Sequence, residues 1–108
     1  MVSARNPKSE RLGEKLLQIR LALGLSQDGM LERLGLAERY FRSRISAYEL
    51  GDREPHLPIL LLYARLVGIS TDVLIDDDMD LPAKLRKAAK QNAVRSKAFL
   101  QSRKALGR

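Results

Sequence analysis

The sequence contains no cysteine, no tryptophan and only one histidine, and its aromatic side chains are limited to two phenylalanines and three tyrosines. Without cysteine the chain cannot form disulfides, thiolate zinc sites or a cysteine nucleophile, which fits a reducing compartment. Hydrophobic residues still make up 44% of the 108 residues, so the chain can bury a core of mainly Leu, Ile, Val and Ala. This composition is typical of a small helical protein with one domain.

The chain also lacks long apolar runs and a secretion signal. Residues 1–15 contain no apolar stretch of the kind found in signal peptides, and the longest apolar run, Ile59–Ala64, is far too short to span a bilayer. We therefore expect a soluble cytoplasmic protein with no membrane partner.

Signals for catalysis and metal binding are weak. His56 has no second ligand-type residue near it in the sequence and is interpreted as a turn residue. A run of acidic residues follows later in the chain, at Asp76, Asp77, Asp78 and Asp80. It lacks the glycine and the closing glutamate of a calcium-binding loop. We interpret these acids as a solvated connector or as an intramolecular partner for a basic tail. The sequence therefore predicts no enzyme, no cofactor, no metal site and no small-molecule ligand.

The net charge of +7 suggests a polyanionic partner, but it is unevenly distributed. Residues 81–108 hold nine Lys and Arg and no acid, whereas residues 1–80 hold 11 Lys and Arg against all 13 acids. The high isoelectric point is therefore a property of the tail. Any nucleic-acid site in the remainder must be inferred from the local placement of basic residues.

Helical periodicity and glycine stops predict two helices in the first third of the chain. The first has Ser9 or a neighbour as its N-cap, ends at Gly24, and aligns on one stripe Leu12, Leu16, Ile19 and Leu23. The second is capped by Ser26, runs from Gln27 to Gly35, and has an apolar face of Met30, Leu31 and Leu34.

Three further helices are predicted after Gly35. One has the apolar spacing Phe41, Ile45 and Tyr48 and is ended by Gly51 and Pro55. The segment Leu57–Val67 is apolar almost all round, which predicts the central buried helix, and a short helix over Asp72–Ile75 follows a cap at Ser70 or Thr71. Two short capped helices in series, as in 27–50, are the framework of a helix-turn-helix.

Three segments resemble the Cro and repressor class of helix-turn-helix domain, also called the xenobiotic-response-element class. They are L-G-L-S-Q at 23–27, L-G at 34–35 and I-S-A-Y-E-L-G-D-R-E-P at 45–55. The resemblance covers residues 12–75 and implies an all-α bundle of five helices that binds double-stranded DNA, commonly as a homodimer on paired half-sites. We accordingly divide the chain into an N-terminal arm (1–9), a helix-turn-helix domain (10–80) and a basic, partly helical C-terminal tail (81–108).

The chain departs from the pattern of this family at two places. Eight residues, 37–44, separate Leu36 from Ile45 where the family usually has four. An insertion of about one helical turn would rotate the downstream face by only roughly 40° if the helix absorbed it. In that case the third helix would simply begin earlier. Leu31 stands where the family usually has Ala, and the larger side chain would push the two helices apart. The departures affect the docking angle more than the fold.

The resemblance also implies roles for individual residues. Gln27 is placed to contact a phosphate or to brace a side chain of the next helix, the alternative being a solvated glutamine in the first turn. The base-reading positions, with exposure to phosphate or solvent alone as the alternative, are Arg42, Ser43, Arg44 and Ala47. Arg39 is a further candidate for DNA contact. Arg53 matches a phosphate-binding position in the loop after the helix, the alternative being an ordinary exposed arginine.

Arg20 and Glu49 stand at positions where the family often has a partly buried ion pair that joins the first helix to the recognition helix. The alternative is that they are two separate surface charges. Helical spacing places Phe41 and Tyr48 in the core rather than on DNA bases. Tyr40 is left open between these two environments.

The sequence thus predicts a sequence-specific, DNA-binding transcriptional regulator of repressor-like type. The alternatives are a protein-interaction module of the same fold, an antitoxin, or a non-specific nucleic-acid-binding protein that uses its tail. For the tail itself the alternatives are a sequence-blind DNA arm, a segment folded back on Asp76–Asp80, a dimerising helix and a solubilising extension.

Overall fold

The computed structural model describes residues 8–83 and 85, and this part of the chain is helical without a strand. The five helices are α1 (Leu12–Leu23), α2 (Gln27–Leu34), α3 (Arg42–Leu50), α4 (Leu57–Val67) and α5 (Thr71–Ile75). The predicted all-α class and five-helix bundle are confirmed. Residues 1–7, 84 and 86–108 lie outside the described residues. Most of the predicted N-terminal arm and of the predicted basic tail falls on these residues.

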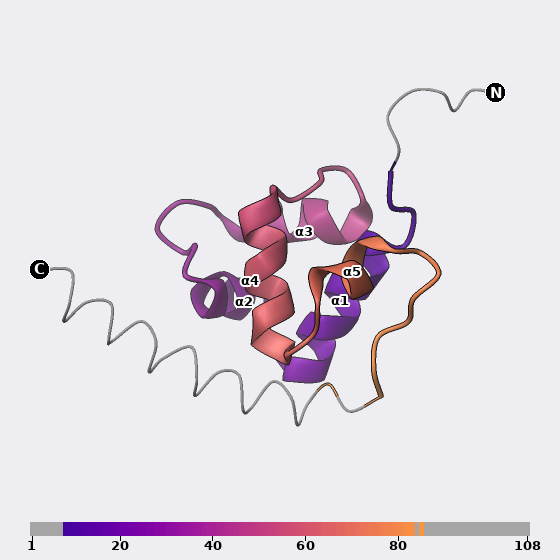
Figure 1. Ribbon diagram of the computed structural model, residues 1–108. Helices are drawn as coiled ribbons and strands as arrows, with labels where there is room; N and C mark the ends of the chain where they lie inside the picture. Colours follow the sequence, from indigo (N-terminus) through magenta and orange to yellow (C-terminus); the bar gives the residue numbers. More distant parts are fainter. Residues whose placement is uncertain (1–7, 84, 86–108) are drawn as a thin grey trace, which may run out of the picture.

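The helices pack around one core, with α4 crossing in front of α3 and beside α1 (Figure 1). Helix α1 contacts α3, α4 and α5, while α2 contacts α3 and α4. The side chains with no exposed surface come from all five helices and include Leu16, Ile19, Met30, Ile45, Tyr63, Val67 and Leu74. Two tyrosines, Tyr48 and Tyr63, are the largest of the fully buried side chains, and aliphatic residues supply most of the rest of the core.

The predicted helix ends agree with the structure at most positions. Ser26 caps α2 by accepting a hydrogen bond from the backbone N–H of Gly29 (2.9 Å), and Ser70 caps α5 through the N–H of Asp72 (3.1 Å). Gly35 and Gly51 follow α2 and α3 with φ of 78° and 81°. Because this left-handed conformation is unfavourable for residues with a Cβ, glycine ends each helix where the next segment must turn away.

Ser9 or a neighbour was predicted as the N-cap of α1; the N-cap position is occupied by Arg11, whose side chain makes no capping hydrogen bond. The Ser9 hydroxyl instead donates to the carbonyl of Ile75 (2.7 Å). The free N–H groups at this end donate to the carboxylate of Asp77, at 2.9 Å from Glu10 and 3.1 Å from Arg11. A carboxylate at a helix N-terminus also interacts favourably with the helix dipole. The acidic run is thus partly a cap for α1 rather than only a solvated connector.

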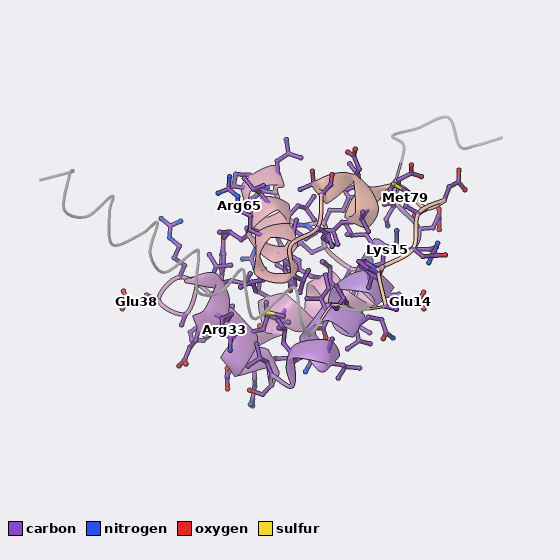
Figure 2. All side chains as sticks on the ribbon, turned by 60° about the horizontal axis from the view of Figure 1, so that its bottom comes forward. Glu14, Lys15, Arg33, Glu38, Arg65 and Met79 are labelled. Atoms are coloured by element: carbon purple, nitrogen blue, oxygen red, sulfur yellow. The ribbon has the colours of Figure 1, made fainter. Side chains whose placement is uncertain are left out.

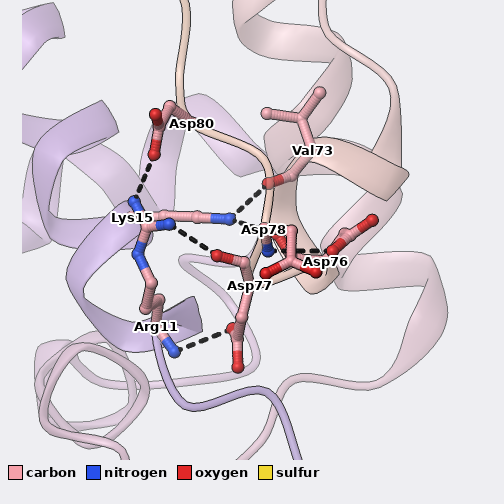
Figure 3. Close-up of polar contacts among 7 residues, drawn as sticks. All are labelled: Arg11, Lys15, Val73, Asp76, Asp77, Asp78 and Asp80. Carbon is pink, nitrogen blue, oxygen red and sulfur yellow. Dashed lines mark hydrogen bonds and ion pairs between the residues drawn. The ribbon is translucent and has the colours of Figure 1, made fainter.

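Two basic residues, Arg11 at the N-cap of α1 and Lys15 within α1, make further contacts with the end of α5 and the residues after it (Figure 3). Arg11 donates to the Asp77 carbonyl (2.6 Å) and to the Asp80 carboxylate (2.8 Å). Lys15 is 2% exposed, and its Nζ donates to the carbonyls of Val73 (2.7 Å) and Asp76 (2.9 Å). The ammonium therefore lies at the C-terminal end of α5, a favourable place for a cation, where it satisfies the carbonyl of Val73 and shares that of Asp76 with the N–H of Met79.

The Asp77 cap gives a testable pH dependence. Hydrogen bonds from the backbone of Glu10 and Arg11 lower the pKa of Asp77 below its ordinary value of 3.8. A carboxyl group whose pKa is lower in the folded state stabilises the fold above the unfolded pKa, and this contribution is lost as the pH falls through the folded pKa. In urea unfolding, the advantage of the natural chain over Asp77→Asn should therefore be constant above about pH 5 and should shrink below pH 4. An advantage independent of pH would contradict this assignment.

Helix α4 is less buried than its sequence predicts. Its buried face includes Ile59, Leu60, Tyr63, Ala64, Leu66 and Val67, but Leu57 is 77% exposed, and Leu61 and Leu62 are also exposed. The segment forms a buried helix as predicted, but only on one face, because α1, α2 and α5 pack against that face and leave the other apolar side chains exposed. None of the described helices is long and apolar enough to cross a membrane.

Candidate nucleic-acid interface

Helices α2 and α3 are joined by a loop, residues 35–41, that holds them in a fixed relation. Leu36 is 9% exposed and anchors the loop in the core. Its carbonyl accepts hydrogen bonds from the N–H groups of Arg39 and Tyr40, both at 3.0 Å. Glu38 of this loop projects away from the helices (Figure 2). Residues 37–39 form a turn, and α3 begins after it, at Arg42, so the structure does not show an earlier start of this helix.

Helix α3 has one face buried in the core and an exposed first turn. Ile45 is fully buried and Tyr48 is 2% exposed, which confirms the prediction that Tyr48 belongs to the core. Leu31, from α2, is 3% exposed and lies in the same core, although α2 and α3 still pack against each other. Arg42 and Ser43 at the start of α3 are exposed. A helix held from behind with its first turn accessible has the form needed to enter a groove.

Arg42 has only a loose partner in the protein. Its guanidinium Nη1 lies 3.7 Å from the carboxylate Oδ2 of Asp28, and the two side chains are 71% and 66% exposed. An exposed ion pair at this distance contributes about 0–1 kcal/mol, so it barely restrains the side chain. The guanidinium of Arg42 is therefore available to an external acceptor.

Arg44, unlike Arg42, is held in place by an aromatic ring of the protein. Its guanidinium carbon lies 4.1 Å from the centre of the Tyr40 ring, a cation–π contact, and the side chain is half-buried. Tyr40 in turn packs against the hydrophobic core. The open question about Tyr40 is answered by this arrangement, because its ring supports an arginine and the core rather than standing free for base stacking. Burial raises the pKa of the neighbouring Tyr48, with Arg44 opposing the shift.

Phe41 does not lie in the core, contrary to the prediction. Its side chain is 84% exposed, the largest exposed fraction among the bulky apolar residues described. The reason is the backbone: Phe41 is the N-cap of α3 with φ −100° and ψ 165°. In this extended conformation its side chain leaves the helical stripe of Ile45 and Tyr48, and Tyr40 occupies the inner position instead.

Arg20 and Glu49 form a bidentate ion pair between α1 and α3. The Nε–Oε2 distance is 2.6 Å and the Nη2–Oε1 distance is 3.1 Å. Their side chains are only 15% and 6% exposed. Arg20 also donates to the carbonyl of Leu25 (3.0 Å), and the Gln27 amide donates to Glu49 Oε1 (3.3 Å). The network fixes α3 to α1 and to the start of α2, with Gln27 in the bracing position.

The remaining site residues lie at the two ends of α3. Arg39 is exposed in the preceding loop, and Arg53 is exposed in the loop that follows. The carbonyl of Ala47 accepts hydrogen bonds from the N–H groups of Asp52 (2.9 Å) and Arg53 (3.2 Å), which ties the second loop to the helix. The structure therefore brings Arg42, Ser43 and Arg44 to the start of α3, whereas Arg39 and Arg53 flank it.

Comparison with known proteins assigns the fold to a family. Residues 16–74, more than half of the chain, match the helix-turn-helix family. A segment of 63 residues is 36% identical to an uncharacterized HTH-type transcriptional regulator, YonR, derived from the SPbeta prophage of Bacillus subtilis. This segment is 58% of the chain and spans 55% of the length of that relative. No solved structure matches the chain. With α2 and α3 packed as a motif on a shared core, the chain belongs to the helix-turn-helix family.

Proposed function

We propose that the protein is a sequence-specific regulator of transcription that places α3 in the major groove of double-stranded DNA. The proposal rests on the exposed first turn of α3: Arg42 and Ser43 are open to solvent, while Ile45 of the same helix is buried in the core. Helix-turn-helix proteins read base edges with the N-terminal residues of the second helix. The name of the prophage-derived relative, a transcriptional regulator, supports the same function.

In this proposal Arg42 is the main base reader. A free guanidinium can donate two parallel hydrogen bonds to O6 and N7 of guanine. Ser43 and Ala47 contribute shorter contacts along α3, and Arg44 reaches the groove from its place on the Tyr40 ring. Arg39 and Arg53 bind phosphates on either side, while Gln27 braces Glu49 and approaches the backbone at the start of α2.

The loop before α3 is the proposed place of a four-residue insertion relative to the family pattern. Since its residues form a turn anchored by Leu36, the insertion would enlarge the surface at the start of α3 and leave the buried side of the helix unchanged. The docking angle of α3 would follow from this larger loop.

We further propose that the protein acts as a homodimer on DNA, in the cytoplasm and without enzymatic activity. Two copies related by a two-fold axis would contact two half-sites about one helical turn apart. Selection of binding sites from random duplex DNA, at a stated salt concentration, tests function and assembly together. We expect a consensus with two symmetric half-sites. A pool that stays random while the protein is folded would contradict the proposed function.

Two arginines of the interface should behave differently when replaced. Arg42→Ala is expected to weaken binding to the selected duplex by about 1–3 kcal/mol and to relax preference at one base pair. Arg53→Ala should weaken binding to all duplexes alike and make the dependence of log affinity on log salt shallower by about one unit. Fluorescence anisotropy titrations on selected and scrambled duplexes separate the two effects. Equal losses on both duplexes for Arg42→Ala would assign that side chain to phosphate contact.

A further inference from the structure

Phe41 is the feature of the interface that the roles above do not use. Its ring is 84% exposed, although it lies next to Arg42 at the start of α3. Phe41 contributes to the described fold through its backbone, because its carbonyl accepts the N–H of Arg44 at 2.8 Å. A smaller side chain could keep that hydrogen bond. The exposed ring therefore needs a reason outside the folding of the chain.

The position of the ring restricts what it can contact. As the N-cap of α3, Phe41 stands at the end of the helix that enters the groove first. Arg42 beside it carries a positive charge with only a loose ion pair to Asp28, so the surroundings favour DNA over an apolar protein surface. In the major groove the apolar group that a base pair presents is the C5-methyl of thymine, and phenylalanine is among the side chains that contact it.

We infer that Phe41 is a specificity-determining residue that packs against the C5-methyl group of a thymine next to the base pair contacted by Arg42. The inference rests on the proposed function. It adds an apolar reading position that the helix-turn-helix pattern of the sequence did not predict, and that arises from the loop which sets Phe41 in an extended conformation. Its contact buries surface that is otherwise left in water.

The test removes the thymine methyl group from the DNA and so leaves the protein unchanged. Each thymine of the selected duplex is replaced in turn by deoxyuridine, which keeps every hydrogen-bonding group and lacks only the C5-methyl. The natural protein should lose about fourfold in affinity at one position in each half-site, the value expected for one buried methyl group. Phe41→Ala should bind the unmodified duplex about tenfold more weakly and should show no further loss with deoxyuridine at that position.

A matched control comes from another exposed apolar residue. Ile75 is 42% exposed and belongs to α5, a helix that lies on the side of the molecule away from the α2–α3 loop (Figure 1). Ile75→Ala should retain the affinity of the natural protein and its sensitivity to deoxyuridine. Thermal unfolding of both variants verifies that they are folded at the temperature of the titration.

The outcomes separate the inference from the function on which it rests. If the natural protein selects a consensus but tolerates deoxyuridine at every position, the assignment of Phe41 is overturned while sequence-specific binding stands. The same holds if Phe41→Ala keeps full affinity, or if it keeps the natural sensitivity to deoxyuridine. If the natural protein selects no sequence, the proposed function and the inference fail together.

Discussion

Replacing Glu49 with Gln is expected to lower the free energy of unfolding by about 3 kcal/mol or more, which is the range for breaking a buried ion pair. The substitution keeps the size of the side chain but leaves the charge of Arg20, which is 15% exposed, without its bidentate partner. The hydrogen bonds that Arg20 donates to Glu49 raise the pKa of the guanidinium in the natural protein. In the variant the guanidinium still stays charged at neutral pH, because arginine is not deprotonated in this range. Urea unfolding at neutral pH measures the effect.

Two controls define what the loss means. Arg42→Gln breaks an ion pair that is exposed on both sides, and should change the free energy of unfolding by less than about 1 kcal/mol. The double variant Arg20→Met, Glu49→Leu removes both buried charges, and should be less destabilised than Glu49→Gln because no charge is left unpaired. A small loss for Glu49→Gln, equal to that of Arg42→Gln, would show that the buried pair does not hold α1 and α3 together.

Replacing Gly13 with Ala should also destabilise the protein, by about 1–3 kcal/mol, although alanine normally favours a helix over glycine. Gly13 lies in the first turn of α1 where it passes close to α3. A Cβ there would be 2.7 Å from the carbonyl oxygen of Glu49 and 2.9 Å from that of Tyr48. Both atoms belong to the backbone of α3, so the helices must move apart, and this displaces the helix proposed to read DNA.

Gly29 provides the matched comparison within another helix. The nearest atoms to a Cβ at Gly29 are the hydroxyl of Ser26 at 3.2 Å and the side chain of Leu25 at 3.4 Å, which can shift slightly. Gly29→Ala should therefore stay within about 1 kcal/mol of the natural protein, as the gain in helix propensity offsets the small adjustment. Equilibrium unfolding compares the two variants. If Gly13→Ala is as stable as Gly29→Ala, the close approach of α1 and α3 is not a constraint.

The local features of this fold could be predicted from the sequence. Ser26 and the glycines at the helix ends act through their own few neighbouring residues, so their roles follow from the pattern alone. Ile45 and Tyr48 keep the helical spacing because both lie inside α3. Phe41 shares that spacing but precedes the helix. The error arose because the start of α3 is set by the anchored loop and not by the apolar period.

The junction between α1 and α5 could not be predicted in the same way. Asp77 is 66 residues from Arg11, and Lys15 is 58 residues from Val73. No local pattern links such positions, and a lysine on an apolar stripe or an aspartate in an acidic run has many possible partners. At the interface, the sequence indicated which arginines were candidates, but only packing distinguishes Arg42, which is exposed, from Arg44, which rests on Tyr40.

We propose above that the first turn of α3 determines which DNA sequence is bound. The most direct measurement is a parallel selection from random duplex DNA with the natural protein and with Arg42→Ala, at the same salt concentration. We predict a two-half-site consensus for the natural protein and, for Arg42→Ala, the same consensus with preference lost at one base pair in each half-site. Identical consensus sequences from the two proteins, or no consensus from the natural one, would contradict the claim.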